Sequence, residues 1–412
     1  MEPINGADTA WMLMSAALVM LMTPALGLFY GGLVRQKNAL STIMDSFFIL
    51  ALVSVQWVLW GYTLAFGPDV NGLIGRMDWL GLRGVGLEPN PTYAATIPHL
   101  AFMAYQMMFA AITPALISGA FAERNRFTAF ALFSLLWATL VYDPVAHWVW
   151  GDGGWLRRLG ALDFAGGTVV HVSSGVSALV CARVFGRRMG YGREAMEPHN
   201  ATMTILGTAL LWFGWFGFNA GSALGSGSLA VSAFVSTNTS AAMAALTWLT
   251  ASWIRHQRPS VLGLAAGALS GLVGITPAAG FVTPMAALLI GFFSGMGCFL
   301  VVELVMRGRV DDSLDVFGVH GIGGTIGSLA TGEFASRLVN PAGADGLLSG
   351  NPALIPAQAL AIVVVATYSG VVTWGLLRLV DAVVGLRVTP EEEVRGLDLT
   401  QHGELAYKAP GF

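Results

Sequence analysis

Two histidines stand in apolar, glycine-rich stretches: His171 in DFAGGTVVHVSSG and His320 in DVFGVHGIGG. An ionisable side chain deep in a membrane is costly, so such groups are functional candidates by default. A neutral imidazole has one donor and one acceptor nitrogen, and it can therefore pass a proton between two partners. If residues 163–171 are helical, His171 lies about 12 Å from Asp163, near the middle of a hydrocarbon core roughly 30 Å thick.

Small side chains line one face of each predicted histidine helix. They are Gly167, Thr168, Ser174, Gly175 and Ala178 beside His171, and Gly323, Gly324, Gly327, Ser328 and Thr331 beside His320. Small residues let membrane helices approach closely, which predicts that the two imidazoles meet. The alternative is two separate core histidines bonded to backbone. A metal site needs further ligands, and none is near in sequence, so we expect neither metal nor cofactor.

The residues before the two histidines also follow a similar order. Each follows an aspartate and an aromatic residue, with Asp163 before His171 and Asp315 before His320. The two helices are five predicted spans apart and run in opposite directions. This arrangement is typical of an inverted repeat with its site at the repeat interface. We therefore expect five plus five helices and a final helix outside the repeat.

The composition identifies the class of protein that holds these helices. Of the 412 residues, 55% are hydrophobic and 11% are charged, whereas soluble domains carry about 25% charged residues. High hydrophobicity also excludes intrinsic disorder. The net charge of −3 lacks the basic excess that is typical of nucleic-acid-binding proteins. The two cysteines are too few for a disulfide-rich fold. The sequence therefore predicts an all-α polytopic membrane protein.

Eleven stretches are long and apolar enough to be transmembrane helices. They lie near 9–33, 40–67, 97–120, 126–147, 166–186, 199–221, 227–254, 260–277, 282–306, 318–336 and 353–385. We predict a transmembrane domain over 1–396, with repeat one at about 9–186, repeat two at about 199–336 and the last helix at about 353–385. Residues 386–412 are predicted to be a cytoplasmic C-terminal tail.

Basic residues in alternate loops predict the orientation, because cytoplasmic loops carry an excess of Lys and Arg. Sixteen of the 21 lie on one side: Arg35, Lys37, Arg124, Arg126, Arg183, Arg187, Arg188, Arg193, Arg255, Arg258, Arg307, Arg309, Arg378, Arg387, Arg395 and Lys408. The other side holds Arg76, Arg83, Arg157, Arg158 and Arg337. This predicts an outer N-terminus and a cytoplasmic tail. The first residues have no basic run, so we expect no signal peptide within the chain.

Aromatic and hydroxyl groups cluster on the outer side of these spans. Three aromatic residues have two possible interpretations: they lie in the interfacial aromatic belt or the core, or they form a face that attracts a small cation. They are Phe109, Trp150 and Phe218. Asp163 reads as a helix cap, and a direct contact with substrate is the weaker interpretation. A triad of Ser222, His171 and Asp163 has no nucleophile elbow around it, so an enzyme is disfavoured.

Several long motifs resemble the ammonium transporter family (Amt/Mep/Rh), and its Amt branch of bacterial or archaeal type in particular. They are DFAGGTVVH at 163–171, GWFGFNAGS at 214–222, DVFGVHG at 315–321, FAERNRF at 121–127 and GLDLTQHGELAY at 396–407. The resemblance implies eleven helices, an inverted repeat and a homotrimer with one pore in each subunit. It also implies transport of ammonium and methylammonium across the cell (inner) membrane, and a cytoplasmic face that binds a PII-type signal protein.

The resemblance also implies roles for single residues. Trp150, Phe109 and Ser222 match the outer ammonium-binding site, and Phe109 with Phe218 matches a phenyl gate. His171 and His320 match the twin histidines that conduct ammonia and relay the proton. Asp163 and Gln106 match supporting residues. The stretch WGDGGW at 150–155 departs from the expected glycine-rich turn through Asp152, which faces water or adds negative potential at the mouth.

The sequence leaves three other functions open. One is an ammonium sensor of the same fold, although the short stretch after the last span offers no output domain. Another is a channel for a gas or a urea-like neutral solute. The third is an intramembrane enzyme, which the absence of paired catalytic groups disfavours. Uptake of labelled methylammonium separates the first two from a transporter.

Overall fold

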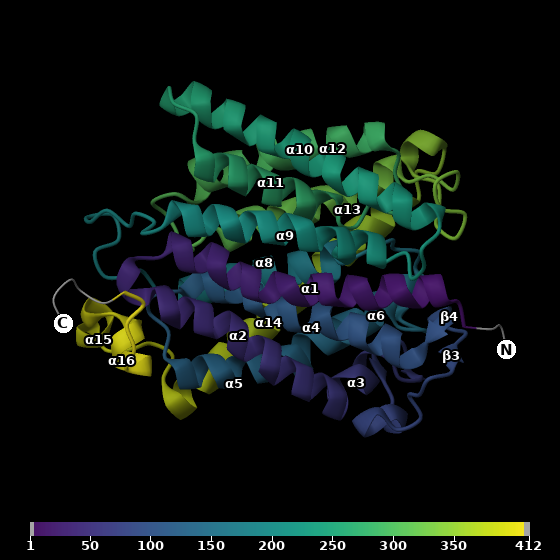
Figure 1. Ribbon diagram of the computed structural model, residues 1–412, viewed down its shortest axis with the longest axis horizontal. Helices are drawn as coiled ribbons and strands as arrows, with labels where there is room; N and C mark the ends of the chain where they lie inside the picture. Colours follow the sequence, from purple (N-terminus) through teal and green to yellow (C-terminus); the bar gives the residue numbers. More distant parts are fainter. Residues whose placement is uncertain (1–3, 408–412) are drawn as a thin grey trace.

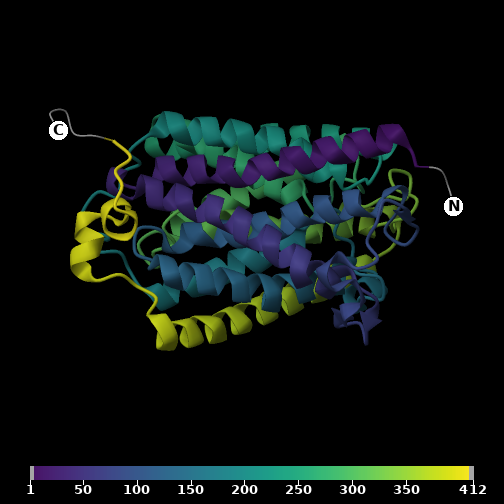
Figure 2. The ribbon, with the colours of Figure 1, turned by 60° about the horizontal axis from the view of Figure 1, so that its bottom comes forward.

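The computed structural model describes residues 4–407, and over this range the chain forms a bundle of long helices (Figures 1 and 2). Lys408 and the rest of the predicted tail to 412 lie outside the described residues. Short 3-10 or π-helical segments are labelled η. The first half contains α1 (Gly6–Leu33), η1 (Gln36–Asn38), α2 (Ala39–Gln56), η2 (Trp57–Gly61), α3 (Tyr62–Phe66), β1 (Asp69–Val70), β2 (Ile74–Gly75), η3 (Met77–Leu82), β3 (Pro89–Asn90), β4 (Ala94–Pro98), α4 (His99–Phe121), α5 (Phe127–Trp137), η4 (Ala138–Tyr142), α6 (Asp143–Trp150), α7 (Trp155–Arg158), η5 (Gly167–Val172) and α8 (Ser173–Phe185).

The second half contains the remaining helices of the bundle and two short helices at its end. They are α9 (Ala201–Gly221), α10 (Ser228–His256), α11 (Val261–Ile275), α12 (Pro284–Leu300), η6 (Val301–Met306), η7 (Phe317–Gly321), α13 (Ile322–Phe334), η8 (Leu347–Ser349), α14 (Leu354–Val384), α15 (Pro390–Arg395) and α16 (Leu397–His402). The two sheets are two-stranded and antiparallel, β1 with β2 and β3 with β4.

Nine helical segments within residues 4–407 are long and apolar enough to cross a membrane. They correspond to nine of the eleven predicted stretches, and most of their ends lie within three residues of the predicted ones. The stretches near 260–277 and 318–336 are also helical but fall short of that measure. Helix α11 is only 15 residues long, because it begins after the capping Ser260 and ends before Pro277. The second covers 317–334 in η7 and α13 and is long enough, but its many glycines, with His320 and Glu333, make it less apolar than the other spans.

One end of the bundle, which we call the outer end after the predicted orientation, carries the segment between α3 and α4, with its two small sheets (Figure 1, right). Asp69 on β1 fixes this segment to α6. One of its carboxylate oxygens lies 2.9 Å from Nε2 of the buried His147, and the other lies 3.7 Å from a guanidinium nitrogen of Arg158. Since α6 ends at Trp150, this contact also holds the outer end of the helix that carries Trp150.

Buried ion pairs hold the opposite end together. Glu123 binds Arg35 at 2.7 Å and Arg188 at 3.3 Å, and Arg188 binds Asp311 at 2.8 Å. Burial alone would raise the pKa of Glu123, but the guanidinium groups of Arg188 and Arg35 outweigh burial and hold the pKa below its usual range. The tail helices α15 and α16 pack at this end, and the N-terminal end of α1 lies at the other (Figure 1).

Candidate functional site

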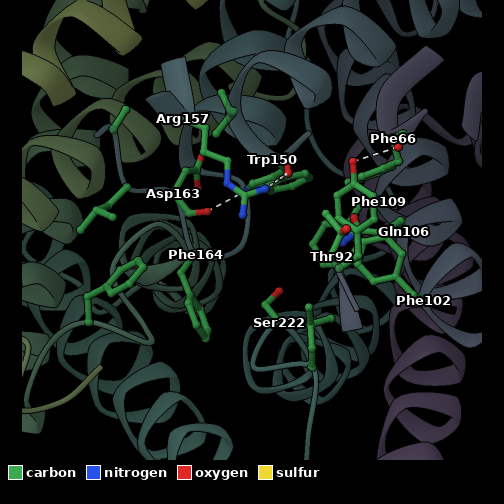
Figure 3. A pocket seen from close by; sticks show the side chains of 16 residues that line it. Phe66, Thr92, Phe102, Gln106, Phe109, Trp150, Arg157, Asp163, Phe164 and Ser222 are labelled. Atoms are coloured by element: carbon green, nitrogen blue, oxygen red, sulfur yellow. Dashed lines mark hydrogen bonds between the residues drawn. The ribbon is translucent and has the colours of Figure 1, made fainter. Parts of the chain in front are cut away.

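A cavity of about 260 Å³ opens between α4, α6, the end of α9 and the segment before η5. Figure 3 shows Trp150, Phe109 and Ser222 around this opening, with Arg157 reaching toward Trp150. The lining residues are Phe66, Thr92, Tyr93, Phe102, Gln106, Phe109, Val149, Trp150, Arg157, Ala161, Leu162, Asp163, Phe164, Ser222, Leu224 and Phe281. This outer cavity therefore brings together all three residues that the resemblance assigns to an outer binding site.

Each of these three side chains is held by a contact of its own. The indole N–H of Trp150 donates to the main-chain carbonyl of Asp163 at 2.8 Å. The Phe109 ring meets the Trp150 ring edge to face, with centroids 5.9 Å apart. The hydroxyl of Ser222 bonds the carbonyl of Phe218 at 2.9 Å. Two aromatic faces and a hydroxyl oxygen at one opening are groups that attract a small cation.

The floor of the outer cavity is aromatic. The rings of Phe109 and Phe218 have centroids 4.2 Å apart, and each side chain is buried. Gln106 lies one turn before Phe109 on α4 and also lines the cavity, and its Oε1 has no hydrogen-bond partner among the described residues. Phe109 and Phe218 come from different helices, α4 and α9, so they close the floor only where these helices pack together.

Below this floor lies a narrow apolar cavity of about 20 Å³. Phe218, His171 and His320 all line it, together with apolar side chains that include Val170, Leu211 and Trp215. A volume of 10–15 Å³ by this measure holds about one water molecule. The space therefore suits one water-sized molecule that makes few polar contacts.

The two histidines meet, which confirms the prediction drawn from the small faces. Nδ1 of His320 lies 3.2 Å from Nδ1 of His171, and both side chains are buried. One Nδ1 must donate and the other accept, so the two rings hold complementary tautomers. Nε2 of His171 has no hydrogen-bond partner among the described residues. The pair can therefore exchange one proton along the Nδ1···Nδ1 contact.

Glycines explain how the two histidine helices come so close. A Cβ added at Gly175 would overlap the main-chain nitrogen of Gly321, next to His320. A Cβ added at Gly324 would lie 2.7 Å from the carbonyl oxygen of Gly167 and 2.9 Å from the Cβ of His171. Neither distance leaves room for a methyl group. Both predicted small faces thus form the crossing point of the two helices.

The carboxylate of Asp163 caps the helix of His171. It accepts main-chain N–H groups of Gly166, Gly167 and Thr168 at 2.7–2.8 Å, and the Thr168 hydroxyl as well. This confirms the cap interpretation. The assumed helix over 163–171 is wrong, because this cap delays the helix until Gly167 and its first turn is π-helical. Burial raises the pKa of the Asp163 carboxyl, and the bonds from Thr168, Gly166 and Gly167 oppose that rise.

The aspartate that corresponds to Asp163 in the second histidine segment is Asp312. The prediction that Asp315 takes this place is wrong. A carboxylate oxygen of Asp312 accepts the main-chain N–H of Phe317, the first residue of η7, at 2.8 Å. Asp312 precedes His320 by the same eight positions that separate Asp163 from His171. Asp315 instead has a left-handed backbone, with φ of 57°, and faces a second cavity.

That second cavity, of about 700 Å³, opens at the end of the bundle where Glu303 and Arg307 lie. Its lining includes Tyr30, Ser252, Glu303, Asp315 and His320. His320 also borders the narrow cavity, so the outer cavity, the phenyl floor, the narrow cavity and this vestibule follow one another through the bundle. Within residues 4–407 no group of three His, Cys, Asp or Glu is placed to hold a metal ion.

Three residues of this path were missed from the sequence. Tyr105 lies behind Ser222, Trp215 stacks on His171 with ring centroids 5.6 Å apart, and Arg157 donates to the carbonyl of Trp150 at 2.9 Å. Tyr105 is one turn before Phe109, and Trp215 is within one turn of Phe218. Helical spacing from the predicted residues could have found these two. Arg157 carries no such signal, because it lies on the short helix α7, and helical spacing from the predicted residues does not reach it.

The family model described as Ammonium Transporter Family matches residues 10–407. The ammonium transporter of Bacillus subtilis is 56% identical over 97% of this chain and 98% of that protein. The ammonium transporter Amt1 of Archaeoglobus fulgidus is 48% identical over 98% of this chain and all of that protein.

Solved structures have the same fold. Mep2 of Saccharomyces cerevisiae is similar with a TM-score of 0.88 and 38% identity, over 94% of this chain and 89% of that chain. A structure named Sensor Amt Protein has a TM-score of 0.89 and 31% identity, over 96% of this chain and 98% of that chain. With its apolar helices and its relatives, the chain is a multi-pass membrane protein and not an enzyme, and it belongs to the ammonium transporter family.

Proposed function

We propose that this protein moves ammonium across the cell (inner) membrane by removing its proton, conducting ammonia and relaying the proton separately. The observation that carries the proposal is the pair His171 and His320, which line a narrow apolar cavity with their Nδ1 atoms 3.2 Å apart. A potassium ion is as large as ammonium but has no proton to give. Selectivity then comes from deprotonation, because the apolar cavity disfavours any charge and admits neutral ammonia.

The outer cavity is the place where the cation binds. Trp150 and Phe109 supply ring faces, and the Ser222 oxygen accepts one N–H of ammonium. Phe109 and Phe218 form the gate through which ammonia leaves this site. Asp163 supports the site through its carbonyl, which fixes the Trp150 indole. Gln106 offers a further acceptor near the gate.

The architecture we propose has eleven membrane helices in a five-plus-five inverted repeat with a last helix outside it. The repeats cover about 9–186 and 199–336, the last helix about 353–385, and together they form the domain 1–396. The matched capping aspartates, Asp163 and Asp312, support this repeat, because each lies eight positions before a histidine in a π-helical turn. The tail, 386–412, faces the cytoplasm, and the N-terminus lies outside. The opposite ends at which α1 begins and α16 ends support an odd number of crossings (Figure 1).

We also propose a homotrimer that transports ammonium and methylammonium and binds a PII-type signal protein on its cytoplasmic face. Exposed apolar side chains on α9 and α10 support contact of these helices with another subunit or with lipid. They are Phe213, Val231, Phe234 and Leu246. The named relatives support the substrate, since both are called ammonium transporters.

The test is uptake of labelled methylammonium in a strain that lacks its own carriers, with wild type, His171→Leu, His320→Leu and Trp150→Leu. Wild type should take up the label. Each histidine variant should lose proton-coupled flux or ammonium-over-potassium preference. Trp150→Leu should raise the half-saturating concentration by a factor between about 3 and 30, because a cation–π contact is worth about 0.5–2 kcal/mol. Unchanged selectivity in both histidine variants contradicts the relay. A Trp150→Leu protein with lower abundance but unchanged half-saturation contradicts the outer site.

A sensor is the second candidate, because the fold also resembles the structure named Sensor Amt Protein. The higher identity to proteins named ammonium transporters favours transport. A sensor binds ammonium without substantial flux, and a gas or urea-like channel conducts without saturation by ammonium. The same uptake assay distinguishes both from a transporter.

A further inference from the structure

Tyr105 lies directly behind the outer cavity, and it is fully buried on α4. Its hydroxyl oxygen is 2.7 Å from the carbonyl oxygen of Phe218, 2.9 Å from that of Gly217 and 3.2 Å from Oγ of Ser222. Its ring meets the Phe109 ring edge to face, with centroids 5.0 Å apart. Tyr105 thus contacts three of the groups that form the outer site and its floor.

The end of α9 explains why a hydroxyl is needed here. The last carbonyls of a helix have no partner within the helix. The N–H of Ser222, the first residue after α9, bonds the carbonyls of Ala220 and Asn219 rather than that of Phe218. The Phe218 carbonyl is instead served by two hydroxyls, those of Tyr105 and Ser222. The turn that carries both the gate ring and the binding hydroxyl is therefore fixed by Tyr105.

Counting donors gives the direction of each proton. Carbonyl oxygens only accept, so the single Tyr105 proton goes to the Phe218 or Gly217 carbonyl, both of which are closer than Ser222. The Ser222 proton then has two acceptors on the protein side, the Phe218 carbonyl and the Tyr105 oxygen. Both draw it away from the cavity, and a chain of such bonds strengthens each member. The oxygen of Ser222 faces the cavity with a free lone pair.

We propose that Tyr105 is a positioning residue that makes Ser222 an acceptor only. A protonated amine, which offers N–H donors and no lone pair, fits such an oxygen. A neutral solute that must accept a hydrogen bond does not. This inference rests on the proposed outer binding site, and it explains how that site prefers the protonated form of its substrate before the proton is removed.

The experiment is a double-mutant cycle on methylammonium uptake, using wild type, Tyr105→Phe, Ser222→Ala and the double variant. Half-saturation does not depend on the number of transporters in the membrane, so partial loss of protein does not affect the result. Tyr105→Phe keeps the ring against Phe109 and removes only the hydroxyl. It should raise half-saturation about three- to tenfold with little change in maximal rate per transporter. In the Ser222→Ala background it should have no further effect, because it acts through Ser222.

Tyr368→Phe is the matched control. Its hydroxyl also bonds a main-chain carbonyl, that of Leu140 at 2.7 Å, but it lies on α14. This variant should leave half-saturation unchanged. The inference is overturned if Tyr105→Phe leaves half-saturation unchanged, or raises it equally in both backgrounds. The proposed outer site fails separately, if neither Trp150→Leu nor Ser222→Ala changes half-saturation.

Discussion

Arg157 carries a positive charge at the outer cavity, where the proposed substrate is also positive. It is the one basic side chain that lines this cavity in the described part of the chain. Arg157→Gln should therefore lower half-saturating methylammonium about two- to threefold at low ionic strength. The effect should fade at 0.15 M salt, because the Debye length falls from about 30 Å at 0.01 M to about 8 Å. The measurement is half-saturation at both salt concentrations.

Arg158→Gln is the control for the loss of one nearby charge. Arg158 is the next residue and is similarly exposed, but its guanidinium faces Asp69 and does not line the cavity. Its removal should change half-saturation less. A rise in half-saturation for Arg157→Gln, independent of salt, contradicts the electrostatic reading. It would mean that Arg157 acts through its bond to the Trp150 carbonyl.

The limits of sequence reasoning are clear at individual residues. The meeting of His171 and His320 was predictable, because both small faces could be counted at helical spacing. The capping role of Asp312 was not, because Asp315 is nearer to the aromatic residue and looks equivalent in sequence. Only backbone geometry distinguishes them: Asp312 accepts the first N–H of η7, whereas Asp315 has a left-handed φ. Helical spacing could place Tyr105 beside Phe109, but its contact with Ser222 depends on how α4 and α9 meet, which no local pattern reports.

The two histidine helices cross closely at Gly175, so a larger residue at this position should push the helices apart. Gly175→Ala puts a methyl group into the backbone of Gly321. The helices must separate, and overpacking of this kind destabilises by about 1–3 kcal/mol. The Nδ1···Nδ1 contact should lengthen, so uptake should fall at least tenfold. Uptake and thermal stability in detergent measure the two effects together.

Gly375→Ala is the matched substitution on α14, where an added Cβ meets nothing within 4 Å. It should keep full uptake and match or exceed wild-type stability, because alanine is the better helix former. Full uptake by Gly175→Ala would show that the close crossing is not needed for function.

The extent of the helices was largely predictable, because apolar length is a strong signal in membrane proteins. The exceptions have physical causes. Helix α11 packs through glycines, such as Gly267 and Gly271 against α10, so it needs no long apolar surface. The π-helical turns at both histidines also left no sequence pattern. Such turns are frequent at functional sites, although this chain also has them elsewhere, as in η2 and η4.

The tail helices α15 and α16 lie at the end of the bundle opposite to β3 and β4 (Figures 1 and 2), and the outer cavity opens beside these two strands, at Thr92 and Tyr93. The ammonium of Lys37 bonds the carbonyls of Glu393 and Val394, and the Glu393 carboxylate binds Arg387 at 2.7 Å. The main-chain N–H of Met189, beyond α8, donates to the same carboxylate. The tail therefore joins the segments that follow α1, α8 and α14, and a change in its docking alters the contacts of all three segments.

Asp398 is the residue on which this docking is best tested. Its two carboxylate oxygens accept the N–H groups of Leu40 and Ser41 at 3.1 and 2.8 Å, so a tail residue caps α2 from outside that helix. Loss of a cap costs about 0.5–2 kcal/mol, or a factor of about 2 to 30 in the docked population. Arg395 is already exposed on the docked α15, so Asp398→Ala should speed tryptic cleavage after Arg395 by loosening the docking, and it should lower the maximal uptake rate. Half-saturation should not change, because the outer cavity is at the other end of the bundle.

Deletion of 396–412 should lower the maximal rate further or abolish binding of a PII-type protein, whereas Glu391→Ala, on the exposed side of α15, should change neither. Wild-type rate, protease resistance and PII affinity in Asp398→Ala and in the deletion would together show that the tail is a passive end.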